Sequence, residues 1–582
     1  MNHSQDLKRL LESIDHKGYP AYKAVQGSYD FKDYILTVDH VQGDPFASPS
    51  KVSVFIPHKI NAFPEGYYDR QWKKTALEDY LLRSFSQEIA RFNFKAKGSG
   101  KSGLIATSRP GQEVLTRSAC ECTGTGITAR FEVGFPAFGR TINSGELIKI
   151  LFDFLPGCVR NVFMYKNRNP KQVRDVIELA EDQEFIRNEL KRLDLVSFAA
   201  DGSVLPRETG ISDRPMKGSV PFSSPESLKI TLNLPHHGPL CGMAVRRGIT
   251  LIVGGGYHGK STLLKALEAG VYNHIAGDGR EYVITDSTAV KLRAEDGRSI
   301  SNVDISLFIN DLPNGRDTSR FSSADASGST SQAAAVIEGI EAGAAAFLID
   351  EDTSATNFML RDELMQKIVS RDKEPITPFI ERARELYEKA GIATVLVAGS
   401  SGAYFYIADT VIQMDSYRPL DITEQVKKAC EAYREISSPA LTAPGFSLPK
   451  PGRKLPAPAA SSDSGRGGAN SGDRRGNRKQ DDRIKVKIFG RDSFQVGKEP
   501  VDLRFVEQLA DSEQTAALAQ MVRFCLERGL FSRCTLKETV DILMLEYEKK
   551  GLAAFNGSNY TAMGLCMPRV QEIYACLNRF RG

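Results

Sequence analysis

Short apolar runs alternate with longer polar and mixed stretches in the middle of the chain. The runs Ile249–Val253, Ala346–Ile349 and Thr394–Ala398 are apolar at nearly every position, with helix-forming residues between them. Strands that are apolar on both sides are typical of a sheet covered by helices on both faces. The pattern therefore predicts an α/β core over residues 225–442.

The region before this core mixes strand-like and helical patterns. Pro170 suits the first turn of a helix. Apolar residues then recur at steps of three and four: Val173, Val176, Ile177, Ala180, Ile186, Leu190 and Leu193. We expect an α+β domain over residues 1–224, with no motif in it strong enough to name a chemistry.

The pattern changes again after the core. Residues 443–484 are rich in Pro, Gly, Ser and Arg and nearly empty of large apolar residues, which predicts a flexible, basic linker. Residues 485–582 then show helical signals. Thr535 and Glu538 form a capping-box pattern, Gly551 suits the end of that helix, and Pro568 opens a last amphipathic helix. We expect a small C-terminal helical domain.

Composition narrows the class of protein. The chain has 582 residues, 41% of them hydrophobic and 25% charged, which is ordinary for a folded protein of several domains. Nine scattered cysteines favour reduced thiols over a metal or disulfide framework. No stretch of 18 apolar residues occurs, so we expect no membrane span and a cytoplasmic location.

The strongest motif directly follows the apolar run Ile249–Val253. Residues 254–262 read GGGYHGKST, which matches G-x-x-x-x-G-K-[ST], and a helical pattern comes next. Such a loop cradles phosphates with its backbone N–H groups at a helix N-terminus. Lys260 would reach the β- and γ-phosphates of ATP, and Ser261 would ligate Mg²⁺. The expected nucleotide ligands in this loop are Gly254, Gly255, Gly256, Tyr257, His258, Gly259, Lys260, Ser261 and Thr262.

Two acids end the apolar run Ala346–Ile349. Asp350 would hold the Mg²⁺ shell, and Glu351 would act as the general base on the attacking water. Lys260 and Glu351 are therefore the expected catalytic residues. A second Gly-Lys-Ser, in residues 95–102, lacks the first glycine of the motif. It is interpreted as a basic loop, either simply solvated or in contact with a phosphate backbone.

Between the P-loop and the two acids lies the segment Ala326–Thr330, with the sequence ASGST. It resembles the LSGGQ signature of ABC proteins and stands at the usual distance from Asp350. The resemblance implies that Ser327, Gly328 and Ser329 contact a γ-phosphate. After the acids, residues 352–357 resemble the stretch PTSALD of ABC proteins, with Asp352 in place of the proline and Asn357 in place of the aspartate.

Two features of ordinary ABC ATPases are missing. No histidine follows His274, so the switch histidine is absent, and Ser400 or Ser401 is the expected hydroxyl substitute. No Q-loop glutamine is evident either, and Asn310 is its proposed stand-in. We therefore expect slow hydrolysis.

These motifs, with LPRETGISDRPM near residue 205 and VDLRFVEQLAD near 501, resemble the atypical, transporter-independent "predicted ABC-class ATPase" family. The resemblance implies an N-terminal domain, an ABC ATPase core, a C-terminal helical domain and a role in RNA binding. One P-loop and one signature-like segment occur per chain, so a composite ATP site predicts an ATP-dependent homodimer.

Local charge agrees with a nucleic-acid partner. Residues 452–487 hold ten Lys or Arg against four Asp, including RG-type pairs. A linker that is basic only for solubility would have the same composition. Three alternatives stay open: a P-loop small-molecule kinase or transferase, a transporter subunit, and an ABC ATPase with a protein partner. The signature-like segment argues against a kinase, and the missing membrane segment argues against a transporter.

Overall fold

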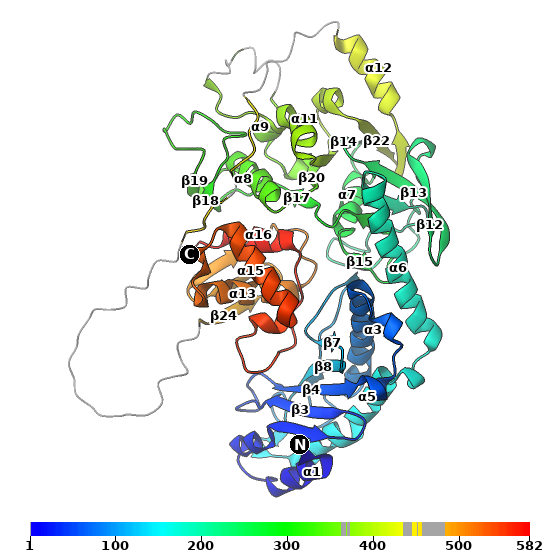
Figure 1. The fold of residues 1–582 in the computed structure, drawn as a ribbon, viewed down its shortest axis with the longest axis vertical. Helices are drawn as coiled ribbons and strands as arrows, with labels where there is room; N and C mark the ends of the chain where they lie inside the picture. Colours follow the sequence, from blue (N-terminus) through cyan, green and yellow to red (C-terminus); the bar gives the residue numbers. More distant parts are fainter. Residues whose placement is uncertain are drawn as a thin grey trace, which may run out of the picture.

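The computed structural model describes residues 2–361, 368, 373–434, 445–450, 452–456 and 484–581. It has three regions, which Figure 1 shows in chain colours: a blue N-terminal region, a green central region and an orange-to-red C-terminal region that lies against both. None of the described helices is long and apolar enough to cross a membrane.

The N-terminal region is built on a seven-stranded, largely antiparallel sheet. Its order is β1-β2-β3-β4-β8-β5, with β7 also paired to β8. The strands are β1 (Asn2–His3), β2 (Gly27–Asp30), β3 (Ile35–His40), β4 (Ser50–Pro57), β5 (Ile105–Ala106), β7 (Cys120–Cys122) and β8 (Gly126–Val133). Buried residues of β4 and β8 share one hydrophobic core with α3 (Gln71–Ala90) and α5 (Leu155–Phe163). Alternating burial along β4 and β8 follows from one apolar and one polar face.

The central region contains the predicted α/β core. Its main sheet has the order β17-β20-β21-β14-β22-β23, and only β23 is antiparallel. The strands are β14 (Ile249–Val253), β17 (Val290–Leu292), β20 (Ala346–Asp350), β21 (Ala393–Val397), β22 (Thr410–Asp415) and β23 (Arg418–Asp421). All three apolar runs of the sequence are strands here: β14 has the predicted bounds, β20 is one residue longer than its run, and β21 is displaced by one residue.

Both faces of this sheet are covered, which confirms the expected α/β layering. On one face, Leu251, Phe347 and Leu396 join the core formed with α8 (Gly328–Glu341) and α11 (Phe379–Ala390). On the other face, Ile252 and Leu348 join the core formed with α7 (Lys260–Ala269). Two buried faces explain why the strands are apolar at successive positions.

A second sheet joins the N-terminal half of the central region. Its order is β12-β13-β11-β16, and its strands are β11 (Leu195–Ala200), β12 (Lys229–Leu234), β13 (Gly238–Arg246) and β16 (Val283–Thr285). Helix α6 (Pro170–Arg192) packs on it, with Asn169 as its N-cap. The predicted boundary at residue 224 therefore separates strands that hydrogen-bond to one another.

The C-terminal region contains the predicted helices and a small sheet that the sequence analysis did not predict. The helices are α13 (Ser512–Glu527), α14 (Leu530–Arg533), α15 (Leu536–Lys550) and α16 (Val570–Arg579). The Thr535 capping box and the left-handed Gly551 at the end of α15 are present as expected. Strands β24 (Val486–Phe489), β25 (Ser493–Val496) and β26 (Glu499–Asp502) form a meander that shares a hydrophobic core with α13. Each of these strands has only four residues, which is too short for an alternation of apolar and polar positions to be recognised in the sequence.

The segment predicted as a flexible linker needs a correction. Arg453 donates from Nε to Glu341 at 2.9 Å and also bonds to Asn578, and Leu455 is buried in the C-terminal core. Residues 452–456 are therefore anchored, because a single arginine joins α8 to α16. Most of the RG-type stretch, residues 457–483, lies outside the described residues.

The C-terminal region contacts both of the others. Arg117 of the N-terminal region, only 2% exposed, donates to Asp511 and Glu513, each at 2.7 Å. Gln508 donates to the backbone carbonyls of Glu268 and Ala289 in the central region, both at 3.2 Å. Charge-assisted bonds therefore join the C-terminal region to the N-terminal region, and neutral side-chain bonds join it to the central region.

Candidate nucleotide site

The P-loop connects β14 to α7, which is the strand–loop–helix context that the motif requires. Gly254 has φ +135° and Gly259 has φ +99°, so both need a residue without Cβ. A Cβ on Gly254 would lie 2.4 Å from the carbonyl oxygen of Met414, and one on Gly259 would lie 2.9 Å from Tyr417. The loop is therefore fitted closely against β22 and the turn after it.

The middle of the loop is supported from the same turn. His258 accepts the backbone N–H of Ser416 on Nδ1 at 2.9 Å and lies 3.2 Å from Asp415. Its carbonyl accepts the N–H of Tyr417 at 3.1 Å. Tyr257, by contrast, has φ +65° and is fully exposed. The sequence analysis did not identify Asp415–Tyr417, because no motif marks a turn that supports a P-loop from 150 residues away.

Lys260 folds back over its own loop. Its Nζ donates to the carbonyl oxygens of Gly254 at 2.7 Å and Gly255 at 2.9 Å. This keeps the ammonium group beside the loop, where it adds to the positive potential at the N-terminus of α7. Gly256 has open space around it, and Thr262 lies in the first turn of the helix.

Ser261 and Asp350 face the same cleft, about 470 Å³ in volume. Ser261 lies in the first turn of α7, and Asp350 ends β20, two strands from β14 in the parallel sheet. Parallel strands bring their carboxyl ends to one edge, so the two side chains meet there. A hydroxyl and a carboxylate are the oxygen donors that Mg²⁺ prefers, so the residues present fit this ion.

Glu351 is held by the loop after β21. Its Oε2 accepts the N–H of Gly399 at 2.6 Å and of Ser400 at 3.1 Å, and its Oε1 accepts the Ser400 hydroxyl at 2.6 Å. The expected hydroxyl substitute at residues 400–401 thus contacts the predicted base itself. Ser401 instead caps the helical turn that follows, by accepting the N–H of Ala403.

The signature-like segment opens α8. Ser327 is the N-cap residue and is exposed, and its hydroxyl bonds to Thr330 at 3.0 Å. Gly328 and Ser329 are buried at the edge of a second hollow, about 430 Å³, which P-loop residues do not line. The two hollows share only Asp352 and Thr353 as lining residues.

The segment after the Walker acids is tied to α8. Ser329 donates to Asn357 at 2.7 Å, and Gln332 bonds to Ser354 at 3.0 Å and to the N–H of Ala355 at 2.8 Å. The stretch that resembles PTSALD therefore links Glu351 to the signature segment through side-chain hydrogen bonds.

Asn310 lies apart from these groups. Its side-chain amide donates to the carbonyl of Ser306 at 2.7 Å, and its backbone N–H donates to Pro375 at 2.8 Å. It lines neither hollow among the residues that the structure describes. The role of Q-loop stand-in for Asn310 stays a prediction that this geometry does not support.

The C-terminal region forms one wall of the P-loop cleft. Arg491, Arg504 and Glu507 line it opposite Ser261 and Asp350. On the facing helix, burial raises the pKa of Glu268 to about 7, and the neighbouring Lys291 ammonium partly offsets this. No motif could have found these residues, because more than 200 positions separate the arginines from the P-loop.

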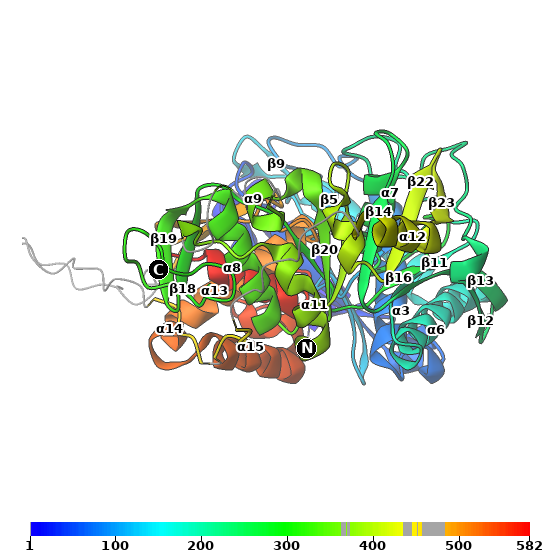
Figure 2. The ribbon, with the colours of Figure 1, turned by 90° about the horizontal axis from the view of Figure 1, so that it is seen from above.

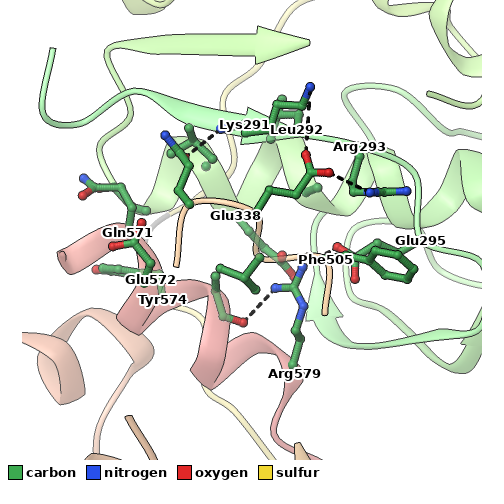
Figure 3. A pocket seen from close by; sticks show the side chains of 18 of the residues that line it. Lys291, Leu292, Arg293, Glu295, Glu338, Phe505, Gln571, Glu572, Tyr574 and Arg579 are labelled. Atoms are coloured by element: carbon green, nitrogen blue, oxygen red, sulfur yellow. Dashed lines mark hydrogen bonds and ion pairs between the residues drawn. The ribbon is translucent and has the colours of Figure 1, made fainter. Parts of the chain in front are cut away.

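Ion pairs join the C-terminal region to the central region beside this cleft (Figure 3). Arg579 donates to Glu295, and Arg293 donates to Glu507 at 2.8 Å while its guanidinium lies over the ring of Phe505. They surround a narrow cavity of about 60 Å³, lined also by Tyr574. Buried pairs of this kind fix the geometry of an interface, since losing one partner leaves a buried charge.

Three family models match the chain. The P-loop domain of ABC ATPases matches residues 169–443, the N-terminal domain of ABC-class ATPases matches residues 4–166, and the MRB1590 C-terminal domain matches residues 485–582. Together they account for all three regions of the fold. The P-loop domain model includes α6 and β11, as the second sheet requires.

Individual relatives are more distant. An uncharacterised protein of Methanocaldococcus jannaschii is 30% identical over 269 residues, which is 44% of this chain. The chain spans 59% of the length of that relative. Among solved structures, CbiO1 from Clostridium perfringens, part of the ABC transporter complex CbiONQ, matches 42% of this chain and 94% of its own, with 13% identity and a TM-score of 0.25.

The family models agree with the geometry of the site. A P-loop, two acids at the end of a neighbouring strand and a serine–glycine segment at the start of α8 occur in the order that the ABC resemblance implies. The N-terminal region has its own matching model as well. The chain therefore carries the N-terminal and P-loop domains of ABC-class ATPases, as its central motifs indicate.

Proposed function

We propose that the protein binds and hydrolyses ATP with Mg²⁺ at sites shared between two copies of the chain, and that this cycle clamps RNA or another nucleic acid. The observation that carries the proposal is the position of Glu351. Three hydrogen bonds from Gly399 and Ser400 hold it directly after Asp350, which shares a cleft with Ser261.

The proposal gives each residue of the site a role in ATP binding or hydrolysis. Lys260 and the loop N–H groups bind the phosphates, and Ser261 and Asp350 would hold Mg²⁺, which neutralises phosphate charge when bound. Glu351 orients the attacking water and accepts its proton. Ser400 takes the position after β21 where the switch histidine is missing. Its hydroxyl has no titratable proton near neutral pH, so it positions Glu351 and leaves the proton with that carboxylate.

Two chains are needed because the signature segment lies in a different hollow from the P-loop. Exposed Ser327 and the N-terminus of α8 are suited to a γ-phosphate presented by a second copy. A head-to-tail pair would place two ATP molecules in the interface. ATP would then strengthen the dimer, and hydrolysis would loosen it.

The nucleic-acid part rests on charge. The net +6 between residues 452 and 487 comes from ten basic residues against four acids, and the family resemblance implies RNA binding. A basic segment that neutralises phosphates releases counterions on binding, which gives an affinity that falls with salt.

Light scattering tests the shared site. Glu351→Gln protein, which should keep ATP intact, is expected to be dimeric with ATP and Mg²⁺ and smaller without them. Adding Ser327→Arg should prevent this change by steric and charge conflict at the γ-phosphate. Ser401→Ala is the matched control, because Ser401 only caps a turn nearby. If Ser327→Arg alone leaves the ATPase rate intact, the two-chain site is wrong.

A further inference from the structure

Three loops of the N-terminal region meet on one surface. They are the connection between β3 and β4, the loop of residues 94–103, and the hairpin of β9 (Ala137–Phe138) and β10 (Thr141–Ile142). Figure 2 shows β9 at the edge of the molecule. Each loop presents an aromatic ring, and the 94–103 loop and the β9–β10 hairpin also present cations. We call this surface the aromatic–basic face. Its members are Phe46, Phe94, Lys95, Lys97, Lys101, Phe138 and Arg140.

The three rings are strongly exposed for phenylalanine. Phe46 is 62% exposed, Phe94 is 47% exposed and Phe138 is 63% exposed. Single exposed apolar residues need no explanation, but three on adjoining loops mark an interaction surface. Phe94 also has φ +58°, which is uncommon for a bulky residue and costs free energy. The loop therefore holds this ring outward against both solvation and backbone preference.

Hydrogen bonds lock the loops together. The N–H of Phe94 donates to Gly103 at 2.8 Å, which closes the loop on itself. Ser99 donates from its N–H to Ala137 at 2.7 Å, and Lys101 donates likewise to Pro45 at 2.9 Å. The backbones of the three loops are therefore joined into one surface.

The cations lie among the rings. Arg140 is bonded to Asp44 at 2.7 Å, with its side chain 79% exposed. Lys95, Lys97 and Lys101 form no ion pair with any residue that the structure describes. Glu146, the other acid here, accepts the backbone N–H of Lys97 and bonds to Lys149. The Lys97 ammonium donates to the carbonyl oxygen of Phe94 at 3.5 Å, and the Lys95 ammonium lies over the ring of Phe92. Neither contact neutralises a charge, so the three lysines can still meet external anions.

We infer that the aromatic–basic face binds single-stranded nucleic acid, with bases stacked on the phenylalanine rings and backbone phosphates on the lysines. Stacking on exposed rings beside cations is how such strands are bound without sequence preference. Lysine is depleted at the centre of protein–protein interfaces, so the composition favours a polynucleotide over a protein partner. The inference rests on the proposed function and names a surface for it. It assigns the binding to a surface of the N-terminal region instead of the basic segment 457–483.

Fluorescence anisotropy with labelled uridine and deoxythymidine 20-mers tests this on the full chain. The variant Phe46→Ala/Phe94→Ala/Phe138→Ala should bind about 10- to 100-fold more weakly, with an unchanged slope of log affinity against log salt. Lys95→Gln/Lys97→Gln/Lys101→Gln should lower that slope by about 2, since each lost phosphate contact removes about 0.7. If these variants lose affinity for both probes, the face binds any single strand. If they lose affinity for the uridine probe alone, the face binds RNA.

Two controls keep the test sharp. Leu545→Ala, which removes an apolar side chain 48% exposed on α15, should bind like wild type. If the triple phenylalanine variant is destabilised in thermal unfolding, Phe46→Ala/Phe138→Ala leaves the strained Phe94 in place and should still lose about tenfold in affinity.

The outcomes separate this inference from the function on which it rests. Wild-type protein that binds neither probe overturns both. Wild-type protein that binds, with equal affinity in the phenylalanine variants and loss only on removal of residues 457–483, overturns the aromatic–basic face and leaves nucleic-acid binding in place. A change of mass of the phenylalanine variants in light scattering without nucleic acid also overturns it, because the face would then be a self-association surface.

Discussion

The P-loop half and the signature half of the predicted ATP site differ in how their polar groups are held. Lys260 is bonded to the carbonyls of its own loop, and Glu351 is bonded to Gly399 and Ser400. Ser327 is exposed at a helix N-terminus, and its hydroxyl bonds to the neighbouring Thr330. The first half is pre-organised within one chain, while the second is presented outward.

This difference matches the task that each half of the site would have. Groups that must hold a proton or a phosphate accurately are fixed by short backbone contacts, which cost no reorganisation during reaction. In the proposed dimer, the group that receives a ligand from the other copy is left accessible. Breaking the first half should therefore abolish chemistry inside one chain, whereas the second half affects assembly.

The largest effect is expected from the base. Glu351→Gln can keep the backbone N–H bonds from Gly399 and Ser400 through its amide oxygen, and its NH2 group can donate to the Ser400 hydroxyl, but the amide cannot take a proton. Turnover should fall by about 10²- to 10⁴-fold, with ATP affinity unchanged. Phosphate release and nucleotide titration measure the two quantities.

Asp352→Asn is the matched control for this change, since it alters the next acid, which lines both hollows. It should retain most of the rate. A normal rate in Glu351→Gln together with a lost rate in Asp352→Asn would move the base to Asp352.

The next largest effect concerns binding. Lys260→Ala removes both a phosphate partner and the two bonds that hold Gly254 and Gly255, so ATP affinity should drop by about 100-fold, comparable to losing a charged hydrogen bond of about 1.5–3 kcal/mol. Isothermal titration with ATP and Mg²⁺ measures it. Lys265→Ala, one turn further along α7 on the same cleft, should change affinity much less. Equal affinities in wild type and Lys260→Ala would refute the P-loop assignment.

A smaller effect sharpens the comparison within the P-loop half. Ser400→Ala removes a side-chain donor to Glu351 and leaves the backbone N–H donors of Gly399 and Ser400. The rate should fall about tenfold, which corresponds to one hydrogen bond of about 1.4 kcal/mol, with unchanged ATP affinity. Ser400→Thr should restore much of it, because the hydroxyl returns. A rate loss that threonine does not rescue would indicate a packing effect.

How far the sequence could lead is clearest at these same residues. Strand β14 has the bounds that its apolar run predicted, and the chain order of P-loop, signature and acids holds in the fold. Continuous apolar runs are informative because both faces of the strands are buried. Local signals also located the capping box at Thr535 and the left-handed Gly551.

Other features depend on contacts between distant segments. The turn Asp415–Tyr417 supports the P-loop through backbone groups, which leave no mark on composition. The wall of Arg491 and Arg504 exists only because the C-terminal region docks beside α7. Strand β11 was placed with the N-terminal domain because its partners β13 and β16 follow it by 40 and 80 residues. Pairing at such a distance cannot be predicted from one sequence.

The smallest effect on turnover is expected from Glu268, on the P-loop side of the interface with the C-terminal region. Burial raises its pKa from 4.5 in the unfolded chain to about 7 in the folded one. The folded protein therefore holds a proton that the unfolded chain has released, and stability should decline as pH rises from about 4.5 to about 7.

Glu268→Gln keeps a neutral side chain at every pH. It should raise the free energy of unfolding at pH 8 by up to about 3 kcal/mol, change little at pH 4.5, and leave the ATPase rate near wild type. Thermal unfolding at the two pH values measures this, with Glu507→Gln as the control for the neighbouring acid that raises the same pKa. That control should lower the Glu268 pKa and so flatten part of the same slope. If the free energy of unfolding of Glu268→Gln depends on pH as it does in the wild type, the carboxyl is ionised in the folded protein. The signature half and the P-loop half would then differ in hydrogen bonding alone.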